Sequence, residues 1–339
     1  MRLSRVRDSL LNLNHLKPNL QYRPSCFQQP IKPILGAYNE VDLFLENWVL
    51  IANPAAGGGR ARKAAERAAR FLDRCGQPLD VYYTRASGHA GELARQAVAA
   101  GTKRLIVCGG DGTIVELLPA LAHQPTTLAL LPAGTSNDFA RGLGIPRRLG
   151  SALDILQHGQ ICKLDLGRIG DRWFCTVAAF GFDAEINHAV NSGRIPFSGT
   201  SGYLYATFKH LAAYRPPQVC LSGEFGEYRG EIFLVATGNT RSYGGGMRIV
   251  PRADPQDGNL DVCIVDKLST RSILKLLPRV FWGGHLNHPA VRCLRTSWLR
   301  IETDAPRLIY ADGEHLGETP ALLRSAPAAL SMILPKNTP

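Results

Sequence analysis

Apolar runs alternate with amphipathic segments in the first half of the chain. The runs that predict strands cover 48–53, 79–84, 104–108 and 127–131. The segments that predict helices cover 60–75, 89–100 and 113–122. In the first of these, alanines and Leu72 recur at helical spacing between Arg and Glu positions, as in a helix that buries one stripe. Regular alternation of strand and helix predicts a parallel sheet with helices on both faces.

The second half of the chain changes to β-rich runs with few helical segments. Strands are predicted at 163–168, 173–179, 218–222, 231–237, 260–265, 298–303 and 330–334. Helical patterns there are confined to 203–214 and 269–282. We therefore expect an α/β fold, with an N-terminal parallel-sheet domain at 46–160 and a second, mainly antiparallel domain at 161–335. Residues 328–335 are also a candidate for a final strand that returns to the first sheet.

Residues 1–45 lack this periodicity. They hold four prolines and many Asn and Gln, a composition that favours an irregular arm outside the core. The arm has six basic and three acidic residues, so residues 46–339 keep +8 of the chain's net charge of +11. A basic body attracts anionic partners such as nucleic acid, phospholipid headgroups or phosphorylated metabolites.

Composition excludes several classes of protein. With 339 residues, of which 45% are hydrophobic, the chain can bury a large core, which excludes wholesale disorder. The eight cysteines stand singly without a C-x-x-C pair, which argues against a zinc site or a disulfide framework. No run approaches 18 apolar residues, and the first 15 residues lack the apolar stretch of a secretory signal. We expect a cytoplasmic protein whose membrane contact is peripheral, at the inner face.

Two glycine-rich loops follow predicted strands of the parallel sheet. They read Asn53-Pro54-Ala55-Ala56-Gly57 after the first strand and Gly109-Gly110-Asp111-Gly112-Thr113 after the third. Ligands of parallel sheets bind at the carboxyl ends of the strands. Glycine lets backbone N–H groups approach an anion where a helix begins. Neither loop has the spacing of a P-loop or of a Rossmann dinucleotide motif, so both suit phosphate in another arrangement.

Asp111 lies among the glycines of the second loop. A carboxylate aimed at a polyphosphate repels it unless a divalent cation lies between them. An acidic phosphate loop therefore implies magnesium. The alternative is that the glycines make tight turns and that Asp111 caps the helix beginning near Thr113.

A third polar loop follows the fourth predicted strand. Thr135 and Asn137 offer hydrogen-bonding groups there, and Asp138 adds a second carboxylate at the same sheet edge. The alternative is again a capped helix, because Asn and Asp are common N-cap residues. Asp165, in the first strand of the second half, is a third candidate acid for a metal network, or else an edge or turn residue.

Several motifs in this order resemble the diacylglycerol kinase catalytic family, in particular its bacterial soluble lipid kinases, which are related to sphingosine kinases. Beyond the two glycine loops, the segments are Gly134-Thr135-Ser136-Asn137-Asp138-Phe139-Ala140-Arg141, Ala179-Phe180-Gly181-Phe182-Asp183-Ala184-Glu185, Gly238-Asn239 with Tyr243-Gly244-Gly245-Gly246, Asp257-Gly258-Asn259-Leu260-Asp261 and Asp312-Gly313-Glu314. The resemblance spans about residues 47–335. Ser136 departs from the family's usual Gly or Ala, and residues 1–45 have no counterpart.

The resemblance implies a nucleotide-binding α/β domain, a β-sandwich-like second domain, and ATP-dependent phosphorylation of a lipid hydroxyl. Carried over by position, the nucleotide-binding residues are Asn53, Pro54, Ala55, Ala56, Gly57, Thr84, Gly109, Gly110, Asp111, Gly112, Thr113, Ile114, Val115 and Thr135. The same resemblance makes Asp312 or Glu314 the general base, with no choice between them.

The resemblance also implies two magnesium sites. The catalytic ion, bound through water, belongs to Asp111, Asp138 and Asp165. A separate structural ion belongs to Asp257, with backbone carbonyls near Asp254 and Asn259.

The implied reaction is phosphorylation of diacylglycerol to phosphatidic acid by ATP and magnesium. Open alternatives are a sphingoid base, phosphatidylglycerol or a soluble metabolite such as NAD as acceptor, or an anionic-lipid-binding protein without activity. We expect a lipid alcohol and an anionic membrane as partners and no nucleic acid, because no nucleic-acid-binding motif is present. The sequence does not separate a monomer from a homodimer.

One helix is a candidate for membrane contact. Its aromatic, aliphatic and basic side chains are Tyr203, Leu204, Tyr205, Phe208, Lys209, Leu211 and Arg215. Such a stretch suits a bilayer interface, and the alternative, slightly favoured, is a helix that packs in the core.

Overall fold

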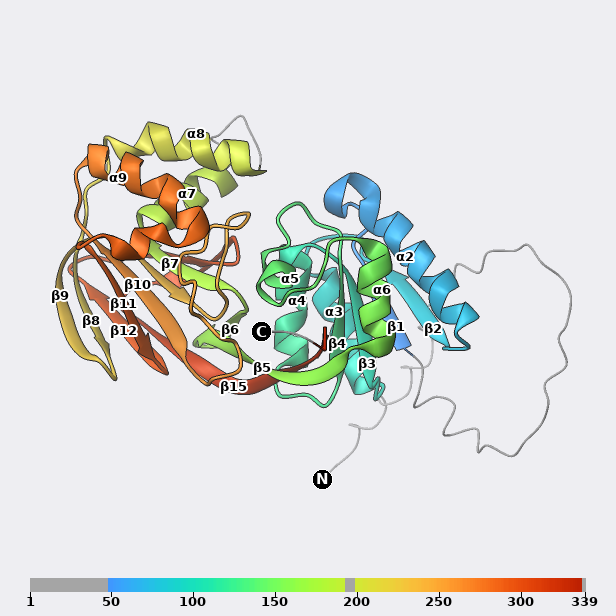
Figure 1. The fold of residues 1–339 in the computed structure, drawn as a ribbon. Helices are drawn as coiled ribbons and strands as arrows, with labels where there is room; N and C mark the ends of the chain where they lie inside the picture. Colours follow the sequence, from blue (N-terminus) through green and yellow to red (C-terminus); the bar gives the residue numbers. More distant parts are fainter. Residues whose placement is uncertain (1–47, 193–198, 337–339) are drawn as a thin grey trace, which may run out of the picture. The chain divides into compact units, whose positions relative to one another are not determined.

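The first sheet is built from four short strands, of which three are mostly buried and one lies at the edge. The computed structural model describes residues 48–192 and 199–336, with the side chains of 199–204 excepted, so the expected arm at 1–45 lies outside the described residues (Figure 1). The strands are β1 (Trp48–Ala52), β2 (Leu79–Tyr83), β3 (Arg104–Gly109) and β4 (Thr127–Pro132). They pair in parallel in the order β2-β1-β3-β4. The end of β15 (Ala321–Leu334) continues this sheet, because Ser331 and Met332 pair in parallel with β4.

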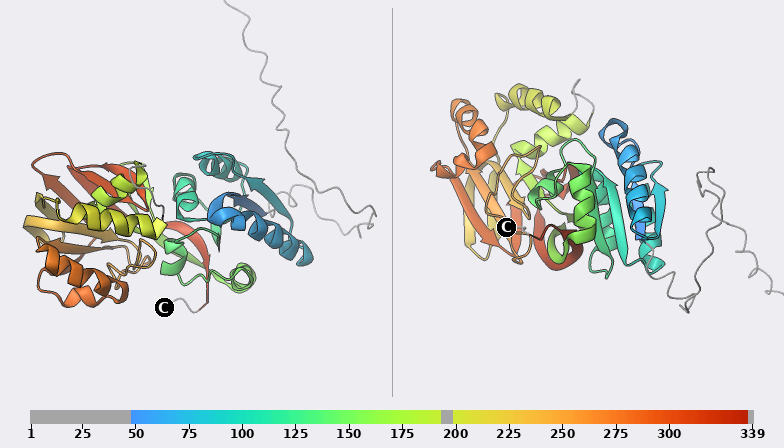
Figure 2. Two further views of the ribbon diagram at one scale, coloured as in Figure 1. Left: turned by 90° about the horizontal axis from the view of Figure 1, so that it is seen from above. Right: turned by 45° about the vertical axis from the view of Figure 1, so that its right-hand side comes forward.

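Helices cover both faces of this sheet, as the sequence predicts (Figure 2). One face carries α2 (Ala56–Arg74) and α6 (Leu149–His158), and the other carries α3 (His89–Ala99), α4 (Asp111–Leu121) and α5 (Asp138–Gly142). The buried stripe of α2 consists of Ala61, Ala65, Ala68 and Leu72. Small alanine side chains allow the helix to lie close to the sheet, so the amphipathic pattern is confirmed.

The second half is a β-sandwich-like arrangement of antiparallel strands, which confirms the expected fold class. One layer has the order β11-β10-β9-β7-β13-β14, and β8, β12, β5 and β6 form the other with the start of β15. The bounds are β5 (Gln160–Ile169), β6 (Arg172–Phe174), β7 (Val177–Gly181), β8 (Gln218–Gly223), β9 (Gly226–Gly238), β10 (Leu260–Asp266), β11 (Val291–Thr296), β12 (Trp298–Thr303), β13 (Leu308–Ala311) and β14 (Glu314–Glu318). Apolar side chains from both layers fill the space between them.

A layer of helices covers the outer face of the sheet that contains β7, β9 and β10 (Figure 1). It consists of α7 (Phe182–Asn191), α8 (Gly199–Leu211), α9 (Thr270–Leu276) and the short 3₁₀ helices η1 (Leu277–Trp282) and η2 (Gly284–Asn287). No helix of the described residues is long and apolar enough to cross a membrane.

Three elements differ from the sequence expectation for physical reasons. The predicted strand 173–179 is interrupted at Cys175 and Thr176, whose backbone N–H groups bind a side chain instead of a strand. The predicted helix 269–282 becomes 3₁₀ at Leu277, because Pro278 has no N–H to continue the α-helical ladder. Helix α2 begins before Arg60, but with three glycines in left-handed conformation. Elements α6, α7, β11, β13 and β14 are not predicted from the sequence, whereas α5 follows Asn137, where a capped helix was the alternative.

Candidate functional site

Hydrogen bonds connect the three loops at the carboxyl ends of β1, β3 and β4. Asn53 Nδ2 donates to Thr113 Oγ1 at 3.2 Å, which joins the first loop to the second. Arg60 donates from Nε to the carbonyl of Gly57 (2.9 Å) and from Nη2 to the carbonyl of Gly134 (3.2 Å). The loops expected to face phosphate therefore form one connected unit.

Close backbone approach makes glycine necessary at two positions of this unit. Gly57 has φ +61°, and a Cβ there would lie 2.0 Å from the carbonyl oxygen of Ala133. A Cβ on Gly134 would lie 2.5 Å from the Cα of Gly110. Asn137 holds the Gly134 turn by accepting from its N–H (2.8 Å) and donating to its carbonyl (2.9 Å). Side chains at these positions would push the loops apart.

A cavity of about 870 Å³ opens at these loops, and we call it the loop cavity. The expected nucleotide-binding residues that line it are Asn53, Pro54, Ala55, Ala56, Gly57, Thr84, Gly110, Gly112, Thr113, Val115 and Thr135. Three expected residues do not line it. Ile114 is buried in the core, Gly109 faces the side chain of Thr113, and Asp111 lines a different pocket. Most of the expected set thus surrounds one cavity.

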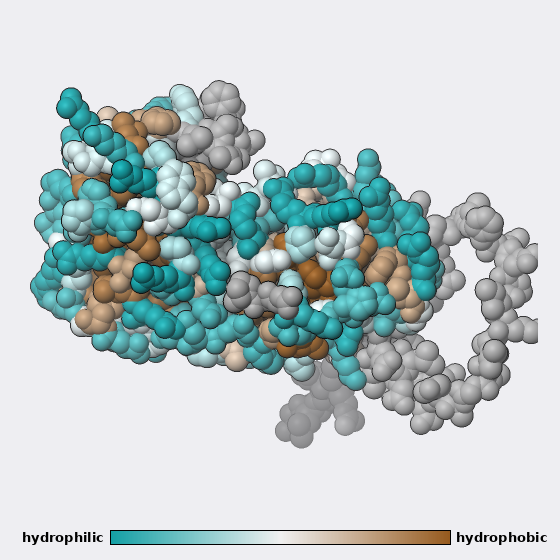
Figure 3. Space-filling model, in the orientation of Figure 1, coloured by the Kyte–Doolittle hydropathy of each residue, from teal (hydrophilic) through white to brown (hydrophobic). Residues whose placement is uncertain are grey.

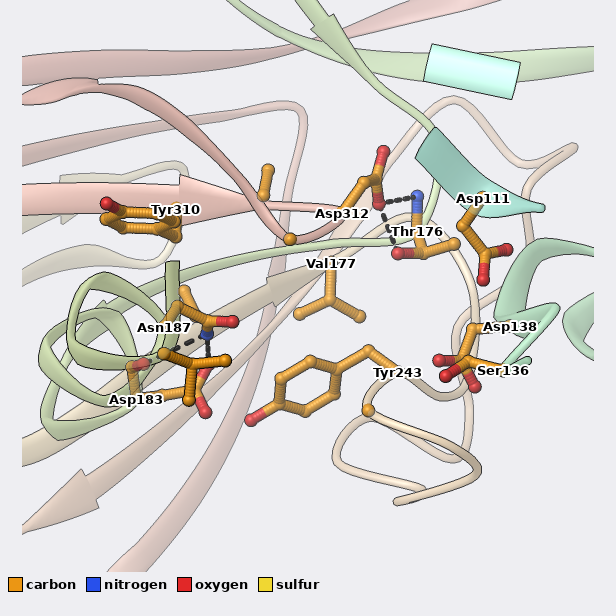
Figure 4. Close-up of a pocket in the computed structure, with 15 residues that line it drawn as sticks. Asp111, Ser136, Asp138, Thr176, Val177, Asp183, Asn187, Tyr243, Tyr310 and Asp312 are labelled. Carbon is orange, nitrogen blue, oxygen red and sulfur yellow. Dashed lines mark hydrogen bonds between the residues drawn. The ribbon is translucent and has the colours of Figure 1, made fainter. Parts of the chain in front are cut away.

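A smaller pocket of about 210 Å³, the inner pocket, is lined by four carboxyl groups. In Figure 4, Asp111 and Asp138 lie at one end, and Asp183 lies at the other beside Asn187. The lining between these polar ends includes Val177, Ala179, Val190, Tyr243 and Tyr310. The pocket therefore combines an acidic end with apolar and aromatic walls.

The loop cavity and the inner pocket adjoin at two turns of the chain. In the first turn, Gly110 and Gly112 line the loop cavity, whereas Asp111 between them lines the inner pocket. In the second turn, Glu314 lines the loop cavity, whereas Asp312 lines the inner pocket. The two candidate bases therefore face different hollows.

Asp312 is held in a hairpin turn between β13 and β14. Asp312 and Gly313 both have positive φ, 53° and 85°, as in a type I′ turn. The Asp312 carboxylate accepts hydrogen bonds from the N–H of Cys175 (2.7 Å), the N–H of Thr176 (2.9 Å) and the Thr176 hydroxyl. Burial raises its pKa, although these hydrogen bonds oppose the shift. The Cys175 thiol, a weak donor, also hydrogen-bonds to this carboxylate, so a ligand hydroxyl has to displace the thiol to reach one of its about four acceptor positions.

Asp111 and Asp138 form an acidic pair at the end of the inner pocket away from Asp183. Asp111 accepts from the N–H of Phe139 (3.1 Å), and Asp138 accepts from Arg141 (2.7 Å) and from the N–H of Gly245 (2.8 Å). Burial raises the pKa of Asp138, and the negative charge of Asp111 raises it further. Two neighbouring carboxylates that disfavour each other's charge suit a shared cation.

The donor chemistry of this pair fits magnesium. Mg²⁺ is commonly held by one or two carboxylates together with waters and substrate phosphates, rather than by a complete protein cage. In residues 48–192 and 199–336, no group of three or more His, Cys, Asp or Glu side chains is arranged to hold a metal ion directly. Asp111 and Asp138 are therefore candidate ligands for an ion whose other ligands come from water and nucleotide.

Asp165 lies apart from this pair. Its carboxylate accepts from the N–H groups of Gly258 (2.6 Å) and Ala328 (2.7 Å), and it does not line the inner pocket. Burial raises its pKa, and the nearby charges of Asp257 and Asp254 add to the shift. Asp165 is thus separated from the other two acids expected around the catalytic magnesium, because backbone donors of the 254–259 loop and of β15 hold its carboxylate.

The residues expected at a structural magnesium site lie in that loop. Asp254 accepts from the N–H of Gln256 (3.1 Å), and Asp257 accepts from the N–H of Asn259 (2.9 Å) and pairs with Arg295. Burial and these neighbouring acids raise the pKa of Asp261 to about 6. The expected role of Asp254, Asp257 and Asn259 in binding an ion stays a prediction.

Other side chains of the site were not assigned a role from the sequence. Arg85 and Arg172 line the loop cavity, together with the acidic residues Glu116, Asp171 and Glu314. Asp183 lines the inner pocket and accepts from Asn187 Nδ2 (3.3 Å) and from the Tyr243 hydroxyl. Burial raises the pKa of Asp183 to about 7. Arg85 could have been suggested by its position after strand β2. The contacts of Asp183 with Tyr243 depend on packing between segments that are distant in the sequence.

Comparison with family models matches both halves of the chain. Residues 47–169 match the diacylglycerol kinase catalytic domain. Residues 176–334 match the YegS C-terminal NAD kinase beta sandwich-like domain. The two matches cover the two halves described above and meet within a few residues of the break between β6 and β7.

Curated relatives resemble the chain over most of its length. A diacylglycerol kinase of Mycobacterium tuberculosis is 37% identical, over 85% of this chain and 94% of the relative. A protein of Pseudomonas fluorescens named "Probable lipid kinase YegS-like" is 33% identical, over 83% of this chain and 91% of the relative. A solved structure titled as a diacylglycerol kinase from Bacillus anthracis has the same fold, with a TM-score of 0.70 at 23% identity over 87% of this chain and 98% of that one.

Proposed function

The chain belongs to the diacylglycerol kinase catalytic family, and we propose that it transfers the γ-phosphoryl group of ATP to the hydroxyl of diacylglycerol, giving phosphatidic acid. The observation that carries this proposal is the junction of the two hollows at Asp111 and Asp312. A nucleotide in the loop cavity and a hydroxyl in the inner pocket would approach each other at these two side chains.

The loop cavity suits the nucleotide. Phosphoryl transfer depends on positioning and on stabilisation of charge more than on covalent chemistry from the protein. Backbone N–H groups of the glycine loops offer that stabilisation, and Arg60 keeps the first and third loops together. Arg85 and Arg172 line the same cavity, although Glu116, Asp171 and Glu314 line it too.

The inner pocket suits an acceptor with a hydroxyl and an apolar body. Asp312 accepts the hydroxyl proton as the acceptor oxygen bonds to the γ-phosphorus, and the bond from that phosphorus to the β,γ-bridging oxygen of ATP breaks. ADP leaves with the bridging oxygen. Backbone and side-chain donors of Cys175 and Thr176 hold the Asp312 carboxylate in place, so its direction in the pocket is fixed.

Asp111 and Asp138 would hold the magnesium ion. Bound there, the ion would offset the negative charge of the phosphates. The protein's own part is to keep two carboxylates at the junction, through the N–H of Phe139 on Asp111 and the N–H of Gly245 on Asp138. A location in the cytoplasm at the inner membrane face, and the choice between monomer and homodimer, stay predictions.

A lipid-panel assay tests this function. Purified protein is incubated with γ-labelled ATP, magnesium and mixed micelles of diacylglycerol, sphingosine or phosphatidylglycerol, and NAD is supplied separately in solution. We expect label in phosphatidic acid, at least tenfold above every other acceptor. Label mainly in sphingosine phosphate, in a phosphatidylglycerol product or in NADP would show that diacylglycerol is not the preferred acceptor. Absence of label in all products would overturn the proposed reaction.

A further inference from the structure

Large hydrophobic side chains are exposed mainly on one part of the molecule. Of the seven such residues in the described part of the chain, five lie in α8 and in the continuous segment of α9 and η1. They are Tyr205, Phe208, Leu274, Phe281 and Trp282. Trp282 is 66% exposed and Phe208 is 60% exposed, so these are not the edges of core residues. We call the five side chains the aromatic face.

The charged residues within the two segments that carry the aromatic face have one sign, although Glu231 of a neighbouring strand lies near Arg215. Neither 199–215 nor 268–290 contains an Asp or Glu. The Lys and Arg residues of the two segments are Lys209, Arg215, Arg271, Lys275 and Arg279. No salt bridge among the described residues neutralises any of the five. Figure 3 shows hydrophobic and hydrophilic surface mixed over the part of the molecule that carries α9.

Both segments pack against elements that line the inner pocket. Helix α8 packs on α7, which supplies Asp183 and Asn187 to the pocket. In η1, the carbonyl of Val280 accepts from the N–H of Arg248 (3.0 Å), within the segment that follows the pocket residue Tyr243. Side chains from α7, α8, α9, η1 and this segment share one apolar cluster. The helices that carry the aromatic face therefore pack against elements that line the pocket.

We propose that the aromatic face docks on an anionic bilayer, with its aromatic side chains inserted at the level of the headgroups. The proposal rests on the proposed function in one respect, since a lipid acceptor has to enter the inner pocket from a membrane. Tyr and Trp favour the bilayer interface, and Lys and Arg beside them attract anionic lipid. Two copies of this face would bring like charges together, which disfavours a dimer through it.

Vesicle binding tests the docking surface. Wild type and the double variant Phe281→Ser/Trp282→Ser are sedimented with phosphatidylcholine vesicles, with or without phosphatidylglycerol. The matched control is Tyr82→Ser/Ile161→Ser, since Tyr82 (44% exposed) and Ile161 (57%) are exposed hydrophobics outside the face. We expect wild type and control to bind anionic vesicles alike and the docking variant to bind at least tenfold more weakly, with an unchanged melting temperature. Equal binding by all three proteins, or no binding by wild type, overturns the proposal.

A second measurement separates this proposal from the function. Each protein is assayed with a short-chain diacylglycerol dissolved as monomers, without vesicles. We expect the docking variant to keep the wild-type rate there and to lose at least tenfold on vesicle substrate. Vesicle binding that needs the aromatic face, in a protein that phosphorylates no lipid, would support docking and contradict the kinase function. A dimer of wild type that the docking variant lacks would replace the bilayer with a second copy of the chain.

Discussion

Replacing Asp312 by Asn distinguishes the catalytic role of this side chain from its contribution to the stability of the fold. The substitution keeps the size of the side chain but removes its charge and one acceptor oxygen. In wild type, Oδ2 accepts from the N–H of Cys175 and Oδ1 accepts from the N–H and hydroxyl of Thr176. The NH₂ group of Asn has to face one of these sets of donors. Facing Cys175 costs least, because only one buried N–H then loses its partner.

The two consequences differ greatly in size. One unsatisfied buried N–H costs about 1–3 kcal/mol, a fraction of the ~5–15 kcal/mol that stabilises a typical protein. Since ~1 kcal/mol corresponds to about 2–4 °C in a domain of this size, we expect melting to fall by only about 2–12 °C. Loss of a general base lowers the rate by about 10²- to 10⁴-fold. Asp312→Asn should therefore be folded and nearly inactive.

The assay measures kcat and the KM for ATP with saturating diacylglycerol, alongside thermal unfolding. Glu314→Gln is the matched control, because Glu314 is exposed and lines the loop cavity instead of the inner pocket. We expect Asp312→Asn to lose kcat with its KM for ATP within threefold of wild type, and Glu314→Gln to keep kcat within about fivefold. A large loss of kcat in Glu314→Gln with wild-type kcat in Asp312→Asn would refute the assignment.

Three further substitutions test other parts of the account. Gly57→Ala should weaken nucleotide binding by at least tenfold in equilibrium titration, because the added methyl would clash with the carbonyl of Ala133 and force the loop open. Unchanged affinity would contradict the role of the glycine loops in nucleotide binding. Burial raises the pKa of Asp183 to about 7, so between about pH 4 and 7 the folded state keeps a proton that the unfolded state has lost. The free energy of unfolding should therefore fall as pH rises through this range, by up to ~4 kcal/mol, and Asp183→Asn should remove that fall in urea titrations. An identical pH dependence of stability in both proteins would exclude Asp183 as its cause. Asp165→Ala should lower the melting temperature while keeping kcat within tenfold, since the Asp165 carboxylate binds backbone N–H groups outside the inner pocket. A large loss of kcat in a variant of wild-type stability would instead support Asp165 as a ligand of the catalytic magnesium.

The fold class could be predicted because local patterns decide it. The apolar runs of β1, β3 and β4 and the alanine stripe of α2 each carry their own period, so alternation alone indicates a parallel sheet with helices on both faces. The hairpin of β13 and β14 was missed although Asp312-Gly313 is a strong turn signal. Its first strand has four residues, too short to show an alternating pattern.

The candidate site could be predicted only as far as each residue's own loop decides its position. Glycine loops after parallel strands place most expected nucleotide residues around the loop cavity. Whether Asp312 or Glu314 faces the inner pocket depends on the side-chain direction in one turn and on donors at Cys175 and Thr176, more than 130 residues earlier. The spacing of residues along the sequence does not predict this contact between Asp312 and the donors of Cys175 and Thr176. Asp165 differs for the same reason, since Ala328 holds it from the far end of the chain.

The most direct test of the central claim is the magnesium dependence of nucleotide affinity in wild type and Asp111→Asn. A non-hydrolysable ATP analogue is titrated into each protein with magnesium and with a chelator. If Asp111 accommodates the triphosphate by sharing a divalent ion, wild type should bind at least tenfold more tightly with magnesium. Asp111→Asn should lose most of that difference, partly because its metal-free binding improves once the like charge is removed. The same magnesium dependence in both proteins would contradict the account.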